Sequence, residues 1–433
     1  MLASRAVGGH PGLLSTLRSA TCRPAHSRAR GPRSLPCRSM SVSVPAFEFV
    51  SAGRIVFGRG EALRRVPKAA KELGATSVLI VVGSSPTRAQ PFADALQALG
   101  IATCFFSIGG AGEPTLDTAE AGLAAAKACN ADLVISIGGG SAVDTGKAIA
   151  ALRTQPEGLL AYMEVVGQGK PLVNRPVPFI AVPTTAGTGA EVTKNSVFDS
   201  PQANVKASIR SDWMVPTLAV VDPELTLGVP ADVTAATGLD ALTQCLEPYV
   251  CCAPNPMTDC LALEGLRRAA RSLRRAYVDG GDVGAREDMC VASLFGGLSL
   301  ANAKLGAVHG FAGPLGGMLH GPHGALCAAM LPAAMAVNVE ALQAGGPACE
   351  PALQRFHTVA QVLTGRADAT AQDGVAWIRD ICAELRIPGL KAYGMTAERV
   401  PEAILKAGKS SSMKGNPVAL SEQQMARILT LSM

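Results

Sequence analysis

The sequence predicts an α/β fold in which a parallel sheet wrapped by helices is followed by an all-helical C-terminal part. Short apolar segments alternate with helical patterns from residue 54 to about residue 225, as in chains that build parallel sheets. The strand patterns stop after Pro230, and the later periodic segments have helical spacing. A chain of 433 residues also has room for two domains and a large core.

Six apolar segments are the expected strands: residues 54–57, 77–82, 102–106, 133–137, 179–182 and 218–221. The main helices are expected at residues 231–250, 255–277, 285–303, 323–335 and 350–363. We place a domain boundary near residues 228–231, so that residues 44–229 form the α/β domain and residues 230–433 the helical domain. In parallel sheets the ligand crevice lies at the carboxyl ends of the strands.

A glycine turn, residues 138–141, follows the fourth strand and leads into an alanine-rich helix. Such a turn presents backbone N–H groups and a helix N-terminus to a phosphate. Glycine suits it because a side chain would block the approach of a pyrophosphate. The turn favours a Rossmann-like, nucleotide-binding sheet, although a plain turn could have the same residues.

A threonine-rich loop, residues 184–189, follows the fifth strand. Its hydroxyls could form a second wall of a cofactor site, or they could simply cap the next helix. Further along the chain, Asp240 and Gln244 are four residues apart and share one face of a helix. His309 and His323 come from two later glycine-containing segments.

Together, in this order and spacing, these segments resemble the iron-containing (group III) alcohol dehydrogenase family, which includes maleylacetate reductase-like members. The resemblance runs from about residue 47 to the C-terminus. It implies a dinucleotide-binding α/β domain, a helical metal and substrate domain, and an active site between them. The implied activity is metal-assisted transfer of a hydride between NAD or NADP and a small alcohol, aldehyde or oxoacid.

The resemblance also implies which residues contact the cofactor: Gly83, Gly138, Gly139, Gly140, Ser141, Asp144, Thr184, Thr185, Thr188, Asn195 and Lys206. Asp144 could instead serve only as a favourable charge at a helix N-terminus, and Lys206 could be a solvated lysine. Gly83 stands where NAD-preferring relatives often carry an Asp. Without that carboxylate NADP should be tolerated, unless Gly83 is only a tight turn.

One divalent metal, Fe²⁺ or Zn²⁺, is implied by the same resemblance, with Asp240, His309 and His323 as ligands and catalytic residues. Gln244 stands where a fourth ligand, a His, is usual, so we expect weaker binding that leans toward harder ions. The metal would polarise the substrate oxygen. Gly313 replaces a common proton-relay His. His320 could substitute for it, but we favour a plain loop histidine.

Three alternatives stay open at this point. Two are enzymatic: a maleylacetate reductase-like activity and a hydroxyacid–oxoacid transhydrogenase. The third is a non-catalytic nucleotide-binding remnant with a decayed metal site. The retention of three of the four ligand positions argues against this alternative.

The first 43 residues contain seven arginines, frequent serines, and no lysine or acidic residue. This composition predicts a disordered transit peptide, for the mitochondrial matrix or alternatively a plastid, although a basic tail would look similar. Without these 43 residues the net charge falls from +5 to about −2. The positive net charge of the whole chain therefore gives no support for nucleic-acid binding.

We expect a small-molecule substrate, no nucleic-acid or membrane partner, and a homo-oligomer, most simply a dimer. The longest uncharged apolar run, residues 324–337, is shorter than a membrane span and contains Pro332. The twelve cysteines show no metal-binding spacing. We expect them to be reduced, small core residues with no catalytic role.

Overall fold

The structure, a computed structural model, describes residues 44, 46–84, 86–109 and 112–433. The predicted transit peptide, residues 1–43, lies outside the described residues. Eight strands are described: β1 (Ile55–Phe57), β2 (Ser77–Val82), β3 (Ala102–Ser107), β4 (Leu133–Gly138), β5 (Phe179–Pro183), β6 (Asn195–Ser200), β7 (Val205–Arg210) and β8 (Leu218–Val221).

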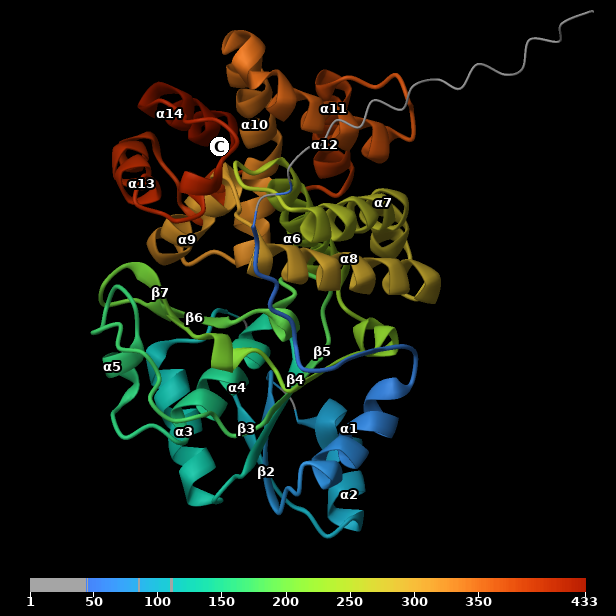
Figure 1. Ribbon diagram of the computed structural model, residues 1–433, viewed down its shortest axis with the longest axis vertical. Coiled ribbons are helices and arrows are strands. Elements are labelled where there is room, and N and C mark those ends of the chain that lie inside the picture. Colours follow the sequence, from blue (N-terminus) through green and yellow to red (C-terminus); the bar gives the residue numbers. More distant parts are fainter. Residues whose placement is uncertain (1–43, 45, 85, 110–111) are drawn as a thin grey trace, which may run out of the picture. The chain divides into compact units, whose positions relative to one another are not determined.

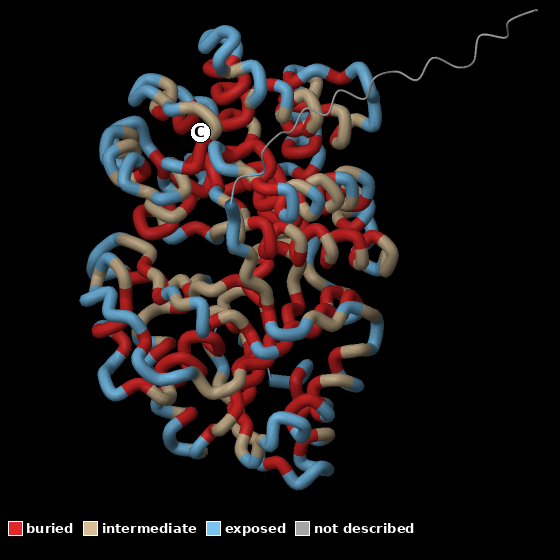
Figure 2. The backbone as a smooth tube through the Cα atoms, viewed as in Figure 1, coloured by how far each residue is buried: buried red, intermediate tan, exposed pale blue. Residues whose placement is uncertain are grey.

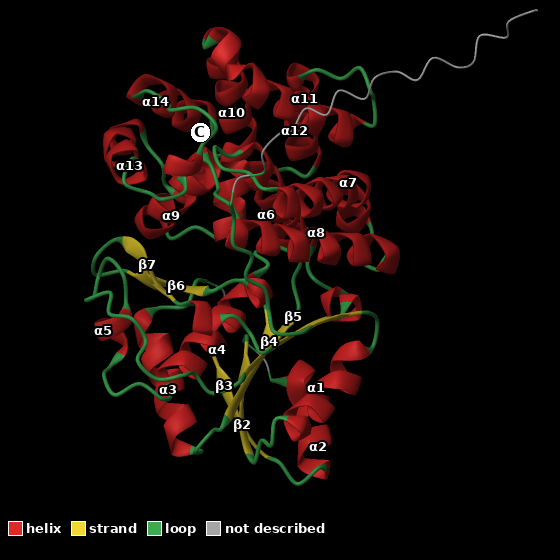
Figure 3. Cartoon of the chain, in the orientation of Figure 1, coloured by secondary structure: helices red, strands yellow, loops and turns green. Residues whose placement is uncertain are grey.

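Six of these strands form one parallel sheet, in the order β1-β8-β5-β4-β2-β3. The helices between them are α1 (Glu61–Glu72), α2 (Gln90–Ala98), α3 (Leu116–Ala128), α4 (Gly140–Leu152) and the short α5 (Leu159–Tyr162). As Figure 3 shows, α1 and α2 lie on one side of the sheet and α3 and α4 on the other. The predicted parallel sheet with flanking helices is therefore confirmed.

The alternation of side chains along β2 explains this layering. Val78, Ile80 and Val82 pack in the hydrophobic cluster that contains α1 and α2, whereas Leu79 and Val81 pack in the cluster with α3 and α4. Successive residues of a strand point to opposite faces. A strand buried on both faces is apolar at nearly every position, which is why β2 and β4 read as continuous apolar runs.

Beyond β8 the chain is helical (Figure 1). The helices are α6 (Ala231–Val250), α7 (Pro256–Val278), α8 (Val283–Asn302), α9 (Ala307–Leu319), α10 (His323–Ala344), α11 (Glu350–Thr364), α12 (Ala371–Glu384), α13 (Val400–Ala407) and α14 (Glu422–Leu431). One large apolar cluster joins them, with α6 and α10 buried at its centre (Figure 2). The predicted helical C-terminal part is confirmed. The boundary between residues 229 and 230 stays a prediction, because residues 44–433 pack as one compact unit.

Two details of the predicted elements are wrong. The helix expected at residues 323–335 continues through Pro332 to Ala344. A proline inside a helix removes one hydrogen bond, but the buried residues on both sides of Pro332 hold this helix in the core. Residues 195–200 and 205–210 form an antiparallel pair, β6–β7, which is not among the six expected strands.

By length and composition α10 could span a membrane, as could α8 and α9 taken as one pair bent by 93°. However, 83% of the apolar window of α10 is buried inside the protein, as in the core helix of a folded domain.

The α/β half meets the helices through backbone contacts at glycines of the threonine-rich loop. A Cβ added to Gly189 would lie 2.6 Å from the Cα of Gly297 on α8, and one added to Gly297 would lie 2.4 Å from the carbonyl oxygen of Gly189. Gly189 also has a φ of +59°, which disfavours other residues. A Cβ added to Gly187 would lie 2.8 Å from the Cβ of Thr237 on α6. The threonine-rich loop therefore lies directly against α6 and α8.

The expectation that every cysteine is a reduced thiol is wrong for one pair. Cys104 on β3 and Cys129 at the end of α3 form a disulfide, with their Cα atoms 6.8 Å apart. The fold brings the two cysteines together, because the C-terminal end of α3 lies beside β3, the strand that precedes it in the chain.

Candidate active site

The glycine turn joins β4 to α4 at the carboxyl end of the sheet. Gly139 is the N-cap of α4, and no side chain caps this helix in the described part of the chain. The first N–H groups of the helix are therefore available to an anionic ligand. A Cβ added to Gly138 would lie 2.6 Å from the Cβ of Ala142, so only glycine fits there.

The threonine-rich loop packs against this turn. The backbone N–H of Thr184 donates to the carbonyl of Gly138 at 2.9 Å. A Cβ added to Gly139 would lie 3.4 Å from Thr185 Oγ1, and one added to Gly140 would lie 2.8 Å from Thr188 Oγ1. The two segments expected to form the cofactor site therefore touch each other, with hydroxyls facing the glycine backbone.

Gly83 directly follows β2 and lies beside the glycine turn, because a Cβ on Gly138 would lie 3.5 Å from the Gly83 nitrogen. A Cβ added to Gly83 itself would meet no atom within 4 Å among the residues described. The position therefore has room for a side chain and is not a glycine for lack of space. Ser141 Oγ donates to the carbonyl of Gly112 at 3.3 Å.

Two residues of the expected cofactor set belong to a buried network around Lys147. Lys147 Nζ donates to the carbonyls of Ala190 and Asn195, at 2.8 and 2.7 Å, and to Thr193 Oγ1 at 3.0 Å. Asp144 Oδ1 lies 3.6 Å from the same ammonium. The network ties α4 to the segment that follows the threonine-rich loop.

Asp144 also accepts a hydrogen bond from the backbone N–H of Val197 at 3.1 Å. Burial raises the pKa of its carboxyl to about 6, although Lys147 opposes the shift. Burial likewise lowers the pKa of the Lys147 ammonium. The structure gives Asp144 and Asn195 this supporting role, and their contact with the cofactor stays a prediction.

Lys206 on β7 is not the solvated lysine of the alternative interpretation, because its side chain is only 5% exposed. Its Nζ lies 3.0 Å from Glu113 Oε1, and the same oxygen accepts the backbone N–H of His323 at 3.2 Å. Burial raises the pKa of Glu113, but the charges of Lys206 and His323 outweigh it, so the pKa is lowered. Glu113 thus links the segment after β3 to the first residue of α10.

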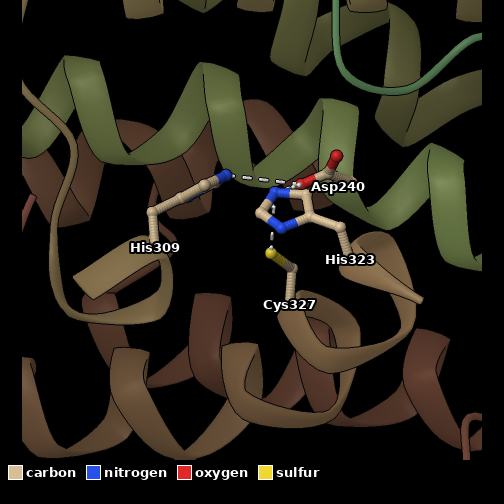
Figure 4. Close-up of side chains that lie close together, drawn as sticks. All are labelled: Asp240, His309, His323 and Cys327. Atoms are coloured by element: carbon tan, nitrogen blue, oxygen red, sulfur yellow. Dashed lines mark hydrogen bonds and ion pairs between the residues drawn. The ribbon is translucent and has the colours of Figure 1, made fainter. Parts of the chain in front are cut away.

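Four side chains from α6, α9 and α10 converge in one cluster: Asp240, His309, His323 and Cys327 (Figure 4). Their ligand atoms all lie within 4.8 Å of one another. Asp240 Oδ1 lies 3.4 Å from His309 Nε2 and 3.8 Å from His323 Nε2. Cys327 Sγ lies 3.7 Å from His323 Nε2. The structure therefore brings together the three residues expected to bind a metal and adds a thiol.

The chemistry of this cluster fits a divalent cation. Asp240 Oδ1 and His309 Nε2 are buried and have no hydrogen-bond partner among the described residues. A buried polar atom without a partner is costly, and a cation supplies one. Burial raises the pKa of Asp240, but the neighbouring imidazoles of His323 and His309 and the hydrogen bond from Gln244 bring it to about 2. The carboxylate is therefore ionised, as a metal ligand must be.

Glu247, two helical turns after Asp240 on α6, orients His309. Its carboxylate oxygens accept His309 Nδ1–H at 2.7 Å and the backbone N–H of Val308 at 2.7 Å. A carboxylate can only accept, so the bond places the proton on Nδ1 and leaves the Nε2 lone pair facing the cluster. Such carboxylate–histidine pairs hold metal ligands in place.

Gln244 does not join the cluster in the way expected. Its Nε2 donates to Asp240 Oδ2 at 2.9 Å. Its carbonyl oxygen is buried and unpartnered within the described residues, and its role as a weak ligand stays a prediction. His320 lies outside the cluster, with Nδ1 2.8 Å from Asp199 Oδ2, and its interpretation as a plain loop histidine stays a prediction. At Gly313 an added Cβ would meet no described atom within 4 Å.

Sequence reasoning missed three members of the site: Glu113, Glu247 and Cys327. A signal existed for two of them. Glu247 follows Asp240 by seven residues and Cys327 follows His323 by four, and both spacings place the side chains on one helix face. Glu113 gave no such signal, because it lies about 210 residues away from the backbone group that it binds.

A cavity of about 330 Å³ lies elsewhere, beside Phe179 and Thr217 at the amino ends of β5 and β8. Ligands of parallel sheets bind at the carboxyl ends, so this cavity is not the expected cofactor site.

Comparisons with known proteins agree with this geometry. Residues 52–223 match the family described as iron-containing alcohol dehydrogenase, and residues 234–433 match the C-terminal part of the Fe-containing alcohol dehydrogenase family. Alcohol dehydrogenase 4 of Saccharomyces cerevisiae is 36% identical over 73% of this chain and 80% of its own length.

Two solved structures resemble the whole fold. A 1,3-propanediol oxidoreductase is 32% identical with a TM-score of 0.80, covering 90% of this chain and 100% of its own. A sulfoacetaldehyde reductase from Bifidobacterium kashiwanohense, solved in complex with NAD+, is 26% identical with a TM-score of 0.77, covering 89% of this chain and 98% of its own.

Proposed function

Because this chain belongs to the iron-containing alcohol dehydrogenase family, we propose that its substrates are small neutral primary alcohols and the matching aldehydes. The protein is an oxidoreductase that uses NAD(P) and a divalent metal. The 1,3-propanediol oxidoreductase among its structural relatives is named for a neutral diol, and the sulfoacetaldehyde reductase for an anionic aldehyde. The charges around the site decide between these two classes.

The observation that carries the function is the contact between the threonine-rich loop and α6, the helix that carries Asp240. The threonine-rich loop touches the glycine turn through Thr185 and Thr188. On its other side, Gly187 touches Thr237, which lies one helical turn before Asp240 on α6. A dinucleotide held by the loop and turn would therefore lie next to the helix that carries Asp240.

Each group has a definable task. The glycine turn and the N-terminus of α4 would bind the pyrophosphate, and the hydroxyls of the loop would orient the rest of the cofactor. Asp240, His309 and His323 would hold the metal, with Glu247 fixing the His309 ring. A divalent ion supplies Lewis-acid polarisation of a hydroxyl or carbonyl oxygen.

Neutral substrates are favoured because the ammonium of Lys206, the cationic side chain near His323, is already paired with a carboxylate. Lys206 Nζ contacts the Glu113 carboxylate at 3.0 Å, and both groups are largely buried. A carboxylate or sulfonate substrate would have to compete with Glu113 for this ammonium. Two like charges at about 4 Å repel by about 1–4 kcal/mol in such surroundings.

The test compares kcat/KM for 1,3-propanediol and 3-hydroxypropionate, which differ in one charged end. We expect the wild type to prefer the diol. Glu113→Gln keeps an oxygen for the His323 N–H but removes the charge, so it should raise relative use of the hydroxyacid by about tenfold or more. Glu157→Gln, which loses an exposed ion pair with Lys170, is the matched control and should leave the ratio of the two kcat/KM values unchanged. A wild type that prefers the hydroxyacid, or an unchanged ratio in Glu113→Gln, would refute the proposal.

We further propose that residues 1–43 direct the protein to the mitochondrial matrix, with a plastid as the alternative. The support is their composition, with seven arginines and no acidic residue. A fluorescent protein carrying these residues should enter mitochondria, and a cytosolic signal would refute the proposal. The expected dimer is a separate proposal that light scattering of the purified protein would test.

A further inference from the structure

We propose that Cys327 is the fourth protein ligand of the metal, in the place expected for Gln244, and that the site therefore selects zinc. This inference rests on the proposed function, since it concerns the metal of the same site. It adds a thiolate that the usual ligand pattern of one Asp and three His does not contain.

The first argument is placement. Cys327 lies on α10 one helical turn after His323, just as Gln244 lies on α6 one turn after Asp240. Each helix thus offers two side chains to the cluster from consecutive turns. The chain lacks an imidazole at position 244 of α6 but has a thiol at the equivalent spacing on α10, so the number of good ligands is four.

The second argument is distance. In a tetrahedral zinc site with ordinary bond lengths, two nitrogen or oxygen ligand atoms lie about 3.3 Å apart, and a nitrogen and a sulfur about 3.6 Å apart. The observed separations are 3.4 and 3.8 Å from Asp240 Oδ1 to the two imidazoles, and 3.7 Å from Cys327 Sγ to His323 Nε2. Three of the six separations are therefore close to those of one tetrahedral ion, and all six lie within 4.8 Å.

The third argument is the state of the neighbouring polar atoms. Asp240 Oδ1 and His309 Nε2 are buried without a hydrogen-bond partner in the described structure, and they point toward each other beside the His323 ring that Sγ contacts (Figure 4). Gln244 presents its amide N–H to the carboxylate, not its carbonyl oxygen. The opposite orientation would set two acceptors against each other. Gln244 is thus a positioning residue that holds Asp240, while the thiol completes the ligand set.

Binding then breaks the Sγ–H bond, forms a bond from Sγ to the ion and releases the proton to solvent. Asp240 and Cys327 together neutralise a divalent ion, whereas one carboxylate with three neutral ligands would leave a positive charge. Thiolate is a soft ligand that suits zinc, whereas a carbonyl oxygen suits harder ions. The direction of metal preference is therefore opposite to that expected from Gln244 alone.

Cobalt reports the ligand directly, because a thiolate bound to Co²⁺ gives a near-ultraviolet charge-transfer band. The full chain is stripped with chelator and loaded with one equivalent of Co²⁺. We expect the band in the wild type and its loss in Cys327→Ala, with the metal dissociation constant raised more than about 100-fold, beyond the loss usual for an outer-shell change. Cys382→Ala is the matched control, since this buried thiol bonds the neighbouring carbonyl of Ala328 from α12 and should leave the band unchanged.

A double variant, Gln244→His with Cys327→Ala, rebuilds one Asp and three His. It should recover tight metal binding without the band and should take up less zinc relative to iron than the wild type when both are offered under anaerobic conditions. Cobalt bound to the wild type without the band, or a band that persists in Cys327→Ala, would overturn the inference and leave the proposed function intact. Full turnover by metal-free protein that still shows the band on loading would overturn the metal requirement and not the ligand assignment.

Discussion

Replacing Glu247 by Gln tests how far the metal site depends on its supporting residues. In the wild type one carboxylate accepts Val308 N–H and His309 Nδ1–H, both at 2.7 Å, and the His309 backbone N–H at 3.4 Å. A glutamine has one acceptor oxygen and one NH₂ group. Either the NH₂ faces His309 and drives its proton to Nε2, or it faces Val308 and leaves a buried N–H unpaired.

Both arrangements have a cost that can be worked out. An unpaired buried donor destabilises the fold by about 1–3 kcal/mol. A His309 ring with the proton on Nε2 cannot bind metal until it changes tautomer, and losing an outer-shell partner of this kind weakens metal binding about 10–100-fold. That range corresponds to about 1.4–2.7 kcal/mol. The stabilisation that added metal gives to the fold should fall by a similar amount.

The assay measures the metal dissociation constant by competition with a chelating dye, and urea unfolding with and without metal. Glu264→Gln is the control, because it makes the same chemical change on α7, where Glu264 pairs with Arg267 and Arg268 at the surface. A dissociation constant within about twofold of the wild type in Glu247→Gln would refute the reasoning, since the His309 orientation would then not depend on the carboxylate.

Three further predictions concern other parts of the chain. Gly83→Asp fits the open space at that position and should shift the ratio of kcat/KM values from NADP toward NAD by about tenfold to several hundredfold, whereas an unchanged ratio would place the adenosine ribose elsewhere. Burial raises the pKa of Glu191 to about 7 from 4.5, so the folded protein keeps a proton that the unfolded chain releases, and stability falls as the pH rises through this range. Glu191→Gln should therefore gain stability relative to the wild type in urea unfolding as the pH rises, and a pH-independent difference would contradict this. A chain lacking residues 1–40 should fold and keep full activity, and its failure to fold would argue against a removable leader.

The strands could be predicted from the sequence because burial on both faces makes them continuous apolar runs between polar or glycine-rich ends. The segments 77–82 and 218–221 were located without error. The pair β6–β7 was not expected in full, since polar residues such as Asn195 and Lys206 alternate with its apolar ones. The extent of α10 was underestimated because Pro332 is a local signal, whereas the packing that outweighs it is a tertiary one.

The candidate site was predictable only in part, because tertiary contacts and not local sequence patterns bring its residues together. Asp240, His309 and His323 could be proposed together because they match a family pattern, not because sequence spacing brings separate helices into contact. Cys327 was overlooked because free cysteines are usually small core residues, and only the meeting of α6, α9 and α10 distinguishes this thiol from the others. Glu113 depends on a contact across the whole fold, which no local pattern encodes.

The contact between Gly189 and Gly297 limits how this enzyme can be altered by mutation. The spacing between the threonine-rich loop and α8, which packs against the metal-binding helix α6, is set there by the thickness of two peptide backbones. No substitution can shorten that spacing, and any side chain at either position would lengthen it. Laboratory evolution toward larger substrates must therefore enlarge the pocket through residues around the site, and it should retain glycine at both positions in every active variant.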